Sequence, residues 1–246
     1  MKILVCVSRV PDTTTKITFT DNNTRFNEDN VQWIMNPSDE WYALVRALEI
    51  KEQQGGSVTV VHVGKADSEP VIRKALAIGA DDAVRIDTEA TDSYIVAAQI
   101  ANYAKDQGYD LIMAGKETID YNGFLVGGMV AEFMDWPFVS LAMSLDVEGS
   151  TATIKRDIGG GKETVKVDFP LVVGAQKGMA EARIPNMRGI MAARTKPLNV
   201  VAPADIESVA AVKMYEEPPA KQAVKLVDPE NPGELIELLH NEAKVI

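Results

Sequence analysis

The sequence predicts an α/β protein with a doubly wound, mostly parallel sheet, added antiparallel strands and an extended C-terminal arm. Strand-like and helix-like segments alternate four times in the first half of the chain. The strand-like segments are apolar on both faces, as expected for a parallel sheet covered by helices on both sides. Residues 198–246 are instead rich in proline and acidic residues. We therefore place one α/β domain at residues 1–200 and an arm at residues 201–246.

Four strand–helix units make up the first half. The predicted strands are 2–8, 57–63, 83–87 and 110–115, and the predicted helices begin near residue 38 and span 68–78, 91–107 and 123–134. Ser38 is a candidate cap for the first helix because its hydroxyl can accept a free N–H of the first turn. Glycines end the first three helices, as glycine commonly does. The stretch from residue 9 to about 36 is polar, irregular and long for a connection, and such loops are often functional.

The second half has a different pattern. Segments 140–149, 151–159 and 162–175 are β-like with turn signals between them, which predicts antiparallel strands added to the sheet or packed near it. Residues 178–194 read as a loop with a short helix near 187–193. The arm closes with a helix at 234–243, whose apolar spacing argues against a fully disordered tail. Such an arm is suited to wrapping a partner chain.

Composition excludes several classes of protein. The chain has 246 residues, 46% of them hydrophobic, and a net charge of −11, which argues against nucleic-acid binding. No run approaches the ~20 apolar residues of a membrane span, so no membrane insertion is expected. The first residues resemble neither a signal nor a transit peptide, so we expect a cytoplasmic protein. The basic segment 176–196 can face an acidic partner or simply be solvated.

No residue pattern in the sequence indicates a catalytic site. We find no Ser-His-Asp grouping, no metal-spaced Cys/His cluster and no pair of carboxylates with catalytic spacing. We interpret His62 as a hydrogen-bonded histidine at a strand end, and the single cysteine, Cys6, as a small core residue. We therefore expect neither catalytic residues nor a metal.

Residues 115–132, GKETIDYNGFLVGGMVAE, follow the fourth strand and lead into a helix. No Gly-Lys pair of the chain completes a P-loop, and there is no GxGxxG. Ligands of parallel sheets bind at the carboxyl ends of strands, and a helix N-terminus offers N–H groups to an anion. The glycines alone fit a phosphate cradle and a tight turn equally well.

Several segments, in this order and spacing, resemble the small (β) subunit of electron transfer flavoproteins. They are MKILVCVSRVPD at the start, MNPSDEWYALVRALEIKE (35–52), AGKETIDYNGFLVGGMVAEFMDWPFVS (114–140), LVVGAQKGMAEARIPNMRGIMAAR (171–194) and EEPP (216–219). The resemblance implies a nucleotide α-hydrolase-like fold. It also implies a heterodimer whose large (alpha) subunit holds most of the FAD, with the small subunit supporting that flavin and often carrying AMP. Electron-bifurcating relatives place a second FAD at the AMP position.

The resemblance further implies a role in electron transport and fatty acid oxidation. Electrons pass from acyl-CoA dehydrogenase-type donors through the flavin toward a quinone-reducing acceptor. Redox chemistry then belongs to the flavin, and this subunit is an electron carrier rather than an enzyme.

Carried over by position, the nucleotide site comprises Val7, Ser8, Asn36, Val63, Gly115, Asp120, Phe124, Leu125, Val126, Gly127, Gly128 and Met129. Asp120 heads the turn, and the backbone of residues 126–129 would hold the phosphate. Phe124 and Leu125 stand where AMP-carrying relatives often have polar residues, and Gly128 replaces a larger one. Backbone capture of phosphate tolerates these changes, whereas side-chain contacts do not. AMP, a second FAD and an empty site all remain open.

Two other regions are implied by the resemblance. Thr13 and Ser38 lie where many relatives place aromatic rings near the flavin. Within the recognition loop, 178–194, Met187 takes the place of the apolar anchor that enters a dehydrogenase. Arg183, Arg188 and Ile190 are its expected companions, with Arg194 further along. The alternative for this loop is a short amphipathic helix packed on the body.

Two other hypotheses about the function of the whole chain remain open. One is a stand-alone adenine-nucleotide-binding regulatory module similar to universal stress proteins, which gives the arm no role. The other is an ATP-cleaving enzyme of the nucleotide α-hydrolase kind. It is disfavoured because residues 8–16, SRVPDTTTK, contain no glycine for a pyrophosphate loop.

Overall fold

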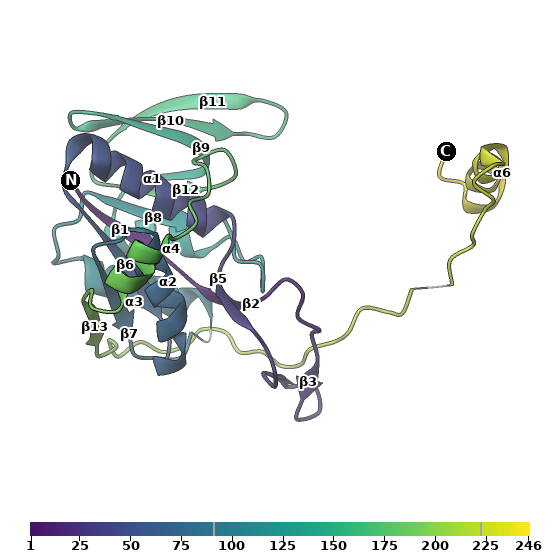
Figure 1. Ribbon diagram of the computed structural model, residues 1–246, viewed down its shortest axis with the longest axis horizontal. Coiled ribbons are helices and arrows are strands. Elements are labelled where there is room, and N and C mark those ends of the chain that lie inside the picture. Colours follow the sequence, from purple (N-terminus) through teal and green to yellow (C-terminus); the bar gives the residue numbers. More distant parts are fainter. Residues whose placement is uncertain (91, 222) are drawn as a thin grey trace.

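A computed structural model describes residues 1–90, 92–221 and 223–246 of the chain (Figure 1). Its centre is a nine-stranded sheet with the order β11-β10-β9-β12-β8-β1-β6-β7-β13. The parallel strands are β1 (Lys2–Cys6), β6 (Ser57–Val63), β7 (Asp82–Ile86), β8 (Leu111–Gly115), β12 (Leu171–Ala175) and β13 (Leu198–Val201). The helices are α1 (Asp39–Gln54), α2 (Glu69–Ile78), α3 (Ser93–Ala104), α4 (Val126–Met134), α5 (Met187–Ala193) and α6 (Pro232–Glu237). A 3₁₀ turn, η1 (Ala66–Ser68), precedes α2, and a π-helical turn, η2 (Leu238–Ala243), follows α6.

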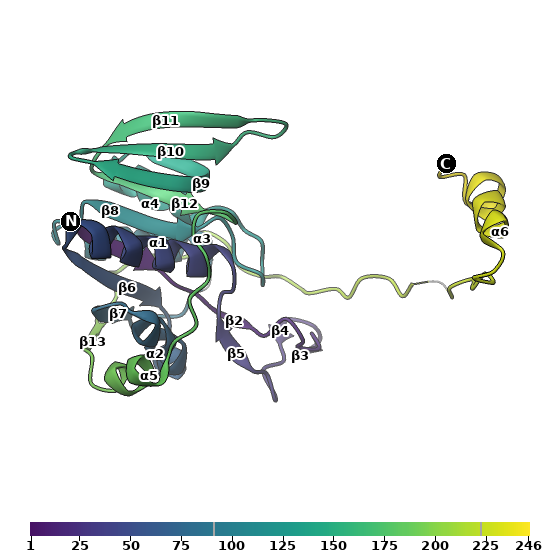
Figure 2. The ribbon, with the colours of Figure 1, turned by 45° about the horizontal axis from the view of Figure 1, so that its top comes forward.

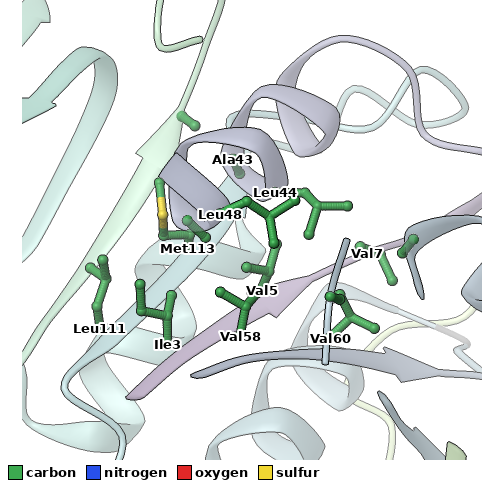
Figure 3. Packing of buried hydrophobic residues seen from close by; sticks show 14 of the residues in the cluster. Ile3, Val5, Val7, Ala43, Leu44, Leu48, Val58, Val60, Leu111 and Met113 are labelled. Atoms are coloured by element: carbon green, nitrogen blue, oxygen red, sulfur yellow. The ribbon is translucent and has the colours of Figure 1, made fainter. Parts of the chain in front are cut away.

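Both faces of the sheet are covered by helices, which confirms the predicted doubly wound α/β fold. Successive residues of β1 point to opposite faces, so Ile3 and Val5 belong to one buried cluster and Leu4 to another. The first cluster packs α1 and α2 against the sheet, with Leu44 and Leu48 of α1 over the central strands (Figure 3). The second packs α3 and α4 on the opposite face.

The strands added to the sheet are β9 (Phe138–Glu148), β10 (Thr151–Asp157) and β11 (Lys162–Asp168). β10 pairs antiparallel with both β9 and β11, as predicted, whereas β9 also pairs parallel with β12. The single strand expected at 162–175 is wrong. The chain breaks at Phe169-Pro170, and the second part, β12, runs parallel between β8 and β9. Proline cannot donate to a ladder, which is the reason for the break.

The stretch from residue 9 to 36 is more ordered than the sequence indicates. Strand β2 (Arg9–Pro11) pairs with β5 (Trp33–Met35), and β3 (Phe19–Thr20) pairs with β4 (Arg25–Phe26), both antiparallel. The turn of the smaller hairpin uses positive φ angles at residues 21–23, which Asp and Asn tolerate. A polar composition concealed these ribbons, because only Val10 and Met35 in them are fully buried.

One helix start and one helix cap differ from expectation. Helix α4 begins at Val126, three residues later than predicted, since Asn122 and Phe124 have positive φ angles of 48° and 49°. Ser38 precedes α1, but it has φ 66° and its side chain makes no cap hydrogen bond, so the predicted cap is wrong. Residue 91, the predicted start of the third helix, lies outside the described residues, and Asp92 caps α3 by accepting Ile95 N–H at 2.7 Å.

The last part of the chain leaves the body in two stages. Strand β13, which the sequence did not predict, adds to the sheet beside β7. The side chain of Gln99 then exchanges two 2.8 Å hydrogen bonds with the backbone of Ala204. After Tyr215 the chain extends away from the body and ends in α6 and η2 (Figure 2).

Candidate functional site

The strand order changes direction between β1 and β8. From β1 the chain proceeds outward through β6 and β7, then returns to place β8 on the other side of β1. Ligands of open α/β sheets bind at such a switch point, beyond the carboxyl ends of the strands. Val7 and Ser8 follow β1 and Gly115 ends β8, so these three predicted residues meet at that edge, and Val63 ends the neighbouring β6.

Asn36 joins the two sides of the switch point. Its backbone N–H donates to Ser8 O at 3.0 Å, its Nδ2 donates to Glu117 O at 3.0 Å, and its Oδ1 accepts Ile119 N–H at 3.0 Å. The side chain is fully buried. Asn36 therefore fixes the loop after β8 relative to the end of β1.

Glu40 is a residue of this edge that the sequence reasoning missed. Its Oε2 accepts Ser8 N–H and its Oε1 accepts Ser8 Oγ–H, both at 2.6 Å. Burial raises the pKa of Glu40 to about 8, although the Ser8 hydrogen bonds act in the opposite direction. A signal was present, because Glu40 stands one turn before Leu44 on the buried stripe of α1.

Gly115 allows the Glu40 side chain to approach the end of β8. A Cβ at position 115 would lie 2.7 Å from Glu40 Cγ and 2.9 Å from Glu40 N. Any larger residue would push the first turn of α1 away from the switch point. The glycine thus serves close packing of helix and strand, in addition to ending the strand.

The N-terminus of α4 is the best candidate for holding a phosphate. Leu125 occupies the N-cap position and offers no side-chain acceptor. The first N–H groups of a helix have no partner within it, so those of residues 126–128 can bind an anion at the positive end of the helix dipole. The N–H of Met129, which the predicted cradle included, instead donates to Leu125 O at 3.0 Å. Gly127 lets the helix approach the ring of Phe138, because an added Cβ would lie only 3.1 Å from that ring. At Gly128 the distance would be 3.5 Å, an ordinary van der Waals contact.

The side chains around this N-terminus are less suited to binding AMP than the backbone N–H groups are. Phe124 and Leu125 are 45% and 50% exposed, and neither can donate to a phosphate. Lys116 pairs with Glu117 at 2.8 Å, and Asp39 and Asp120 add negative charge nearby. The residues therefore fit a phosphate through the backbone alone, with the buried Val7 and Val63 as apolar surface.

The two residues predicted near the flavin, Thr13 and Ser38, are both exposed. Thr13 follows β2, and Ser38 directly precedes α1. His62 is buried, its Nδ1 lies 2.8 Å from Val7 O, and burial lowers its pKa. Within the described ranges, no group of three or more His, Cys, Asp or Glu side chains can hold a metal. No helix of those residues is long and apolar enough to span a bilayer.

The predicted recognition loop is fastened to α1 at its start. Trp41 Nε1 donates to Arg183 O at 3.0 Å, and the Arg183 guanidinium makes two bonds to the Glu52 carboxylate at 2.6 and 2.9 Å. The Arg183 charge is therefore paired within the chain. Arg188 is exposed, as are Met187 at 73% and Ile190 at 40%. Asn186 caps α5 by accepting Gly189 N–H at 2.8 Å.

The nine-stranded, mostly parallel sheet, with helices on both faces and a switch point between β1 and β8, defines a doubly wound α/β protein. A family model described as the electron transfer flavoprotein domain matches residues 24–206. The electron transfer flavoprotein subunit beta of Bacillus subtilis is 37% identical over 260 residues, covering 100% of both chains. The subunits beta of Syntrophomonas wolfei and Homo sapiens are 34% and 33% identical, covering 93% and 91% of this chain and 90% and 91% of their own.

The chain belongs to the electron transfer flavoprotein family, in which it is a beta, or small, subunit. Such subunits are electron-transfer proteins and form a heterodimer with an alpha subunit. The family resemblance drawn from the sequence is thereby confirmed.

Proposed function

We propose that this chain supports the FAD of the large subunit and docks reduced dehydrogenases, so that electrons pass toward a quinone-reducing acceptor. The observation that carries the proposal is the recognition loop. Its start is fixed to α1 through Trp41 and Glu52, while Met187 and Met191 are 73% and 55% exposed. Exposed apolar side chains on a fixed support suit brief docking to a partner. Acyl-CoA dehydrogenases are the proposed donors.

The bound FAD supplies the redox chemistry, and the protein supplies position and electric field. The large subunit holds most of the flavin, and the segments around Thr13 and Ser38 face it. These exposed residues carry no aromatic ring, so they leave more of the flavin open than aromatic side chains would.

We propose AMP as the ligand of the switch-point edge. The backbone N–H groups of residues 126–128 would hold its phosphate, and Asn36 keeps the preceding loop in place. Capture through the backbone accommodates Phe124 and Leu125. A second FAD at this edge would make the protein an electron-bifurcating variant.

The arm is proposed to wrap the large subunit in the cytoplasm. Leu235 and Ile236 of α6 are 46% and 60% exposed, and Leu226 in the preceding segment is 89% exposed. Apolar side chains in that number on an extended segment are stabilised by burial against a partner.

The test is to co-express the chain with its large subunit, denature the purified complex and identify the released nucleotides by mass spectrometry. One FAD and one AMP per heterodimer is the expected result. Two FAD would instead establish a bifurcating protein. One FAD alone, with no AMP regained on titration, would make the loop after β8 a structural turn. No flavin and no complex would favour the stand-alone regulatory module.

A further inference from the structure

An open surface cavity of about 540 Å³ lies between α2 and the recognition loop. Its walls include Arg73, Lys74 and Ala77 from α2, and Pro185, Ile190 and Arg194 from the loop. It adjoins the proposed docking helix, α5, which packs against α2 (Figure 2). Nothing in the family assignment gives this cavity a role.

The two walls are fastened by hydrogen bonds that run in both directions. Arg73, on α2, donates to Ala193 O at 2.8 Å and to Lys196 O at 2.6 Å, at the C-terminal end of α5. Lys196 in turn donates to Leu76 O at 2.9 Å and Ala80 O at 2.5 Å, at the C-terminal end of α2. Each cation thus satisfies the free carbonyls of the other helix, where the helix dipole favours positive charge.

A glycine brings the helices together. A Cβ at Gly189 would overlap the backbone oxygen of Ala77. Ala193 is buried in the same contact. The two helices that border the cavity therefore pack closely against each other.

The cavity combines an apolar interior with a positive rim. Ala77, Pro185 and Ile190 supply apolar surface. Of the charged residues that line it, three are cations and none is an acid. Among the ion pairs of the described residues, none involves Lys74 or Arg194, and Lys74 lies 4.6 Å from the centre of the Trp41 ring. The rim of the cavity is therefore positively charged, although the chain as a whole has a net charge of −11.

Helical spacing places the cavity beside the exposed methionines. Met187 and Met191 are four residues apart and share one side of α5, and both are exposed. Ile190 and Arg194, also four residues apart, face the cavity. A partner that covers the methionines therefore also reaches the rim.

We infer that this cavity receives an apolar side chain flanked by carboxylates, presented by the dehydrogenase that docks on α5. The inference rests on the proposed function. Each protein then inserts a side chain into the other. Met187 enters the partner, and a partner side chain enters between α2 and α5. The apolar group displaces water from the walls, and its neighbouring carboxylates meet Lys74 and Arg194. The charge pairs lie at the rim, so salt weakens them.

The first test uses the heterodimer with ¹³C-labelled isoleucine methyl groups. The probe is an N-acetylated, amidated peptide, Asp-Asp-Leu-Asp-Asp, and the matched control is Lys-Lys-Leu-Lys-Lys. We expect the Ile190 methyl signal to shift progressively with the acidic peptide and not with the basic one. The shift should diminish in ~1 M salt, where the screening length falls to ~3 Å. Equal responses to the two peptides, or no shift at millimolar acidic peptide, would overturn the inference.

The second test measures reduction of the heterodimer by an acyl-CoA dehydrogenase supplied with its acyl-CoA substrate. Arg194→Glu should slow the second-order rate by about tenfold at low salt, in the range of steering effects. Lys166→Glu, the same charge change on the distant strand β11, should leave it unchanged. If both variants match the parent while Met187→Ala is slow, the cavity has no docking role and the proposed function stands. If the parent is not reduced while the acidic peptide still shifts Ile190, the proposed donor is wrong and the cavity site stands.

Discussion

The ring of Tyr215 lies parallel to the ring of Phe19, with centroids 4.8 Å apart and 5° between the planes. The backbone N–H of Tyr215 also donates to Asn23 O at 2.7 Å, and its hydroxyl lies 3.2 Å from that of Tyr121. One residue of the arm thus contacts both the β3–β4 hairpin and the loop after β8. This is the last described attachment of the arm to the body before the chain extends outward.

We expect Tyr215→Ala to release this part of the arm. A stacked aromatic pair contributes about 0.5–1.5 kcal/mol beyond the area that it buries. The amide of residue 215 should therefore exchange its hydrogen roughly tenfold faster, and so should amides of the β3–β4 hairpin. Hydrogen exchange followed by mass spectrometry measures both. Tyr215→Phe, which keeps the ring and loses only the hydroxyl, is the control and should retain most of the protection.

The same attachment gives a sharper truncation experiment for the arm. Deleting residues 217–246 should weaken association with the large subunit and leave the melting temperature of the isolated chain within a few degrees of the parent. Deleting residues 205–246 should also destabilise the body, because the arm satisfies Asp92, which accepts Val209 and Ala210 N–H at 3.2 and 3.3 Å. Sedimentation and thermal unfolding separate these effects. Full co-purification of the shorter deletion with the large subunit would contradict the proposed wrapping.

Glu40 should make stability depend on pH in a defined direction. Its pKa is about 8 in the folded chain against 4.5 for the unfolded group. Between these values the folded state binds more protons, so the free energy of unfolding should fall as pH rises, by up to about 1.4 kcal/mol per pH unit. The contribution is complete below pH 4.5 and is lost above about 8.

Glu40→Gln removes this titration while keeping the ability to bond Ser8. Urea unfolding at pH 5, 6.5 and 8 should therefore show a smaller decline for the variant than for the parent. Glu163→Gln, at an exposed carboxylate paired with Arg156, serves as the control. Parallel curves for the parent and Glu40→Gln would show that the carboxyl is ionised throughout.

Gly189→Ala should displace α5 from α2, since the added methyl group meets the backbone oxygen of Ala77, which cannot move aside cheaply. We expect a loss of about 1–3 kcal/mol of stability, as for other overpacked contacts. Gly128→Ala is the matched helical glycine, with its nearest contact at 3.5 Å, and should be neutral or stabilising. Chemical unfolding gives both values, and equal effects at the two sites would refute the close α2–α5 contact.

Met187→Ala should slow reduction by an acyl-CoA dehydrogenase and leave the flavin content intact. The side chain is 73% exposed, so its removal opens no internal cavity, and stability should change by less than ~0.5 kcal/mol. Stopped-flow reduction and the flavin absorbance of the purified heterodimer are the two measurements. Unchanged reduction kinetics would eliminate Met187 as the anchor.

The sequence determined the strand–helix alternation, the two-faced burial of the parallel strands and the family. These follow from short-range patterns, because apolar periodicity and turn residues act over a few positions. Tertiary structure decided the rest. Residues 162–175 form two strands in different parts of the sheet. β11 pairs with the preceding β10 as a hairpin, whereas β12 pairs with β8, which lies far away in the sequence.

The candidate site, too, was predicted only in part from the sequence. Spacing and resemblance identified the loop after β8, but not that Asn36 fixes it or that the buried Glu40 bonds Ser8. Arg183 reads as a free charge in the sequence, yet it pairs with Glu52, 131 positions away. Tyr215 gave no sign of meeting Phe19. The sequence determines the chemical character of each side chain. Which residue it contacts depends on how the fold brings distant segments together.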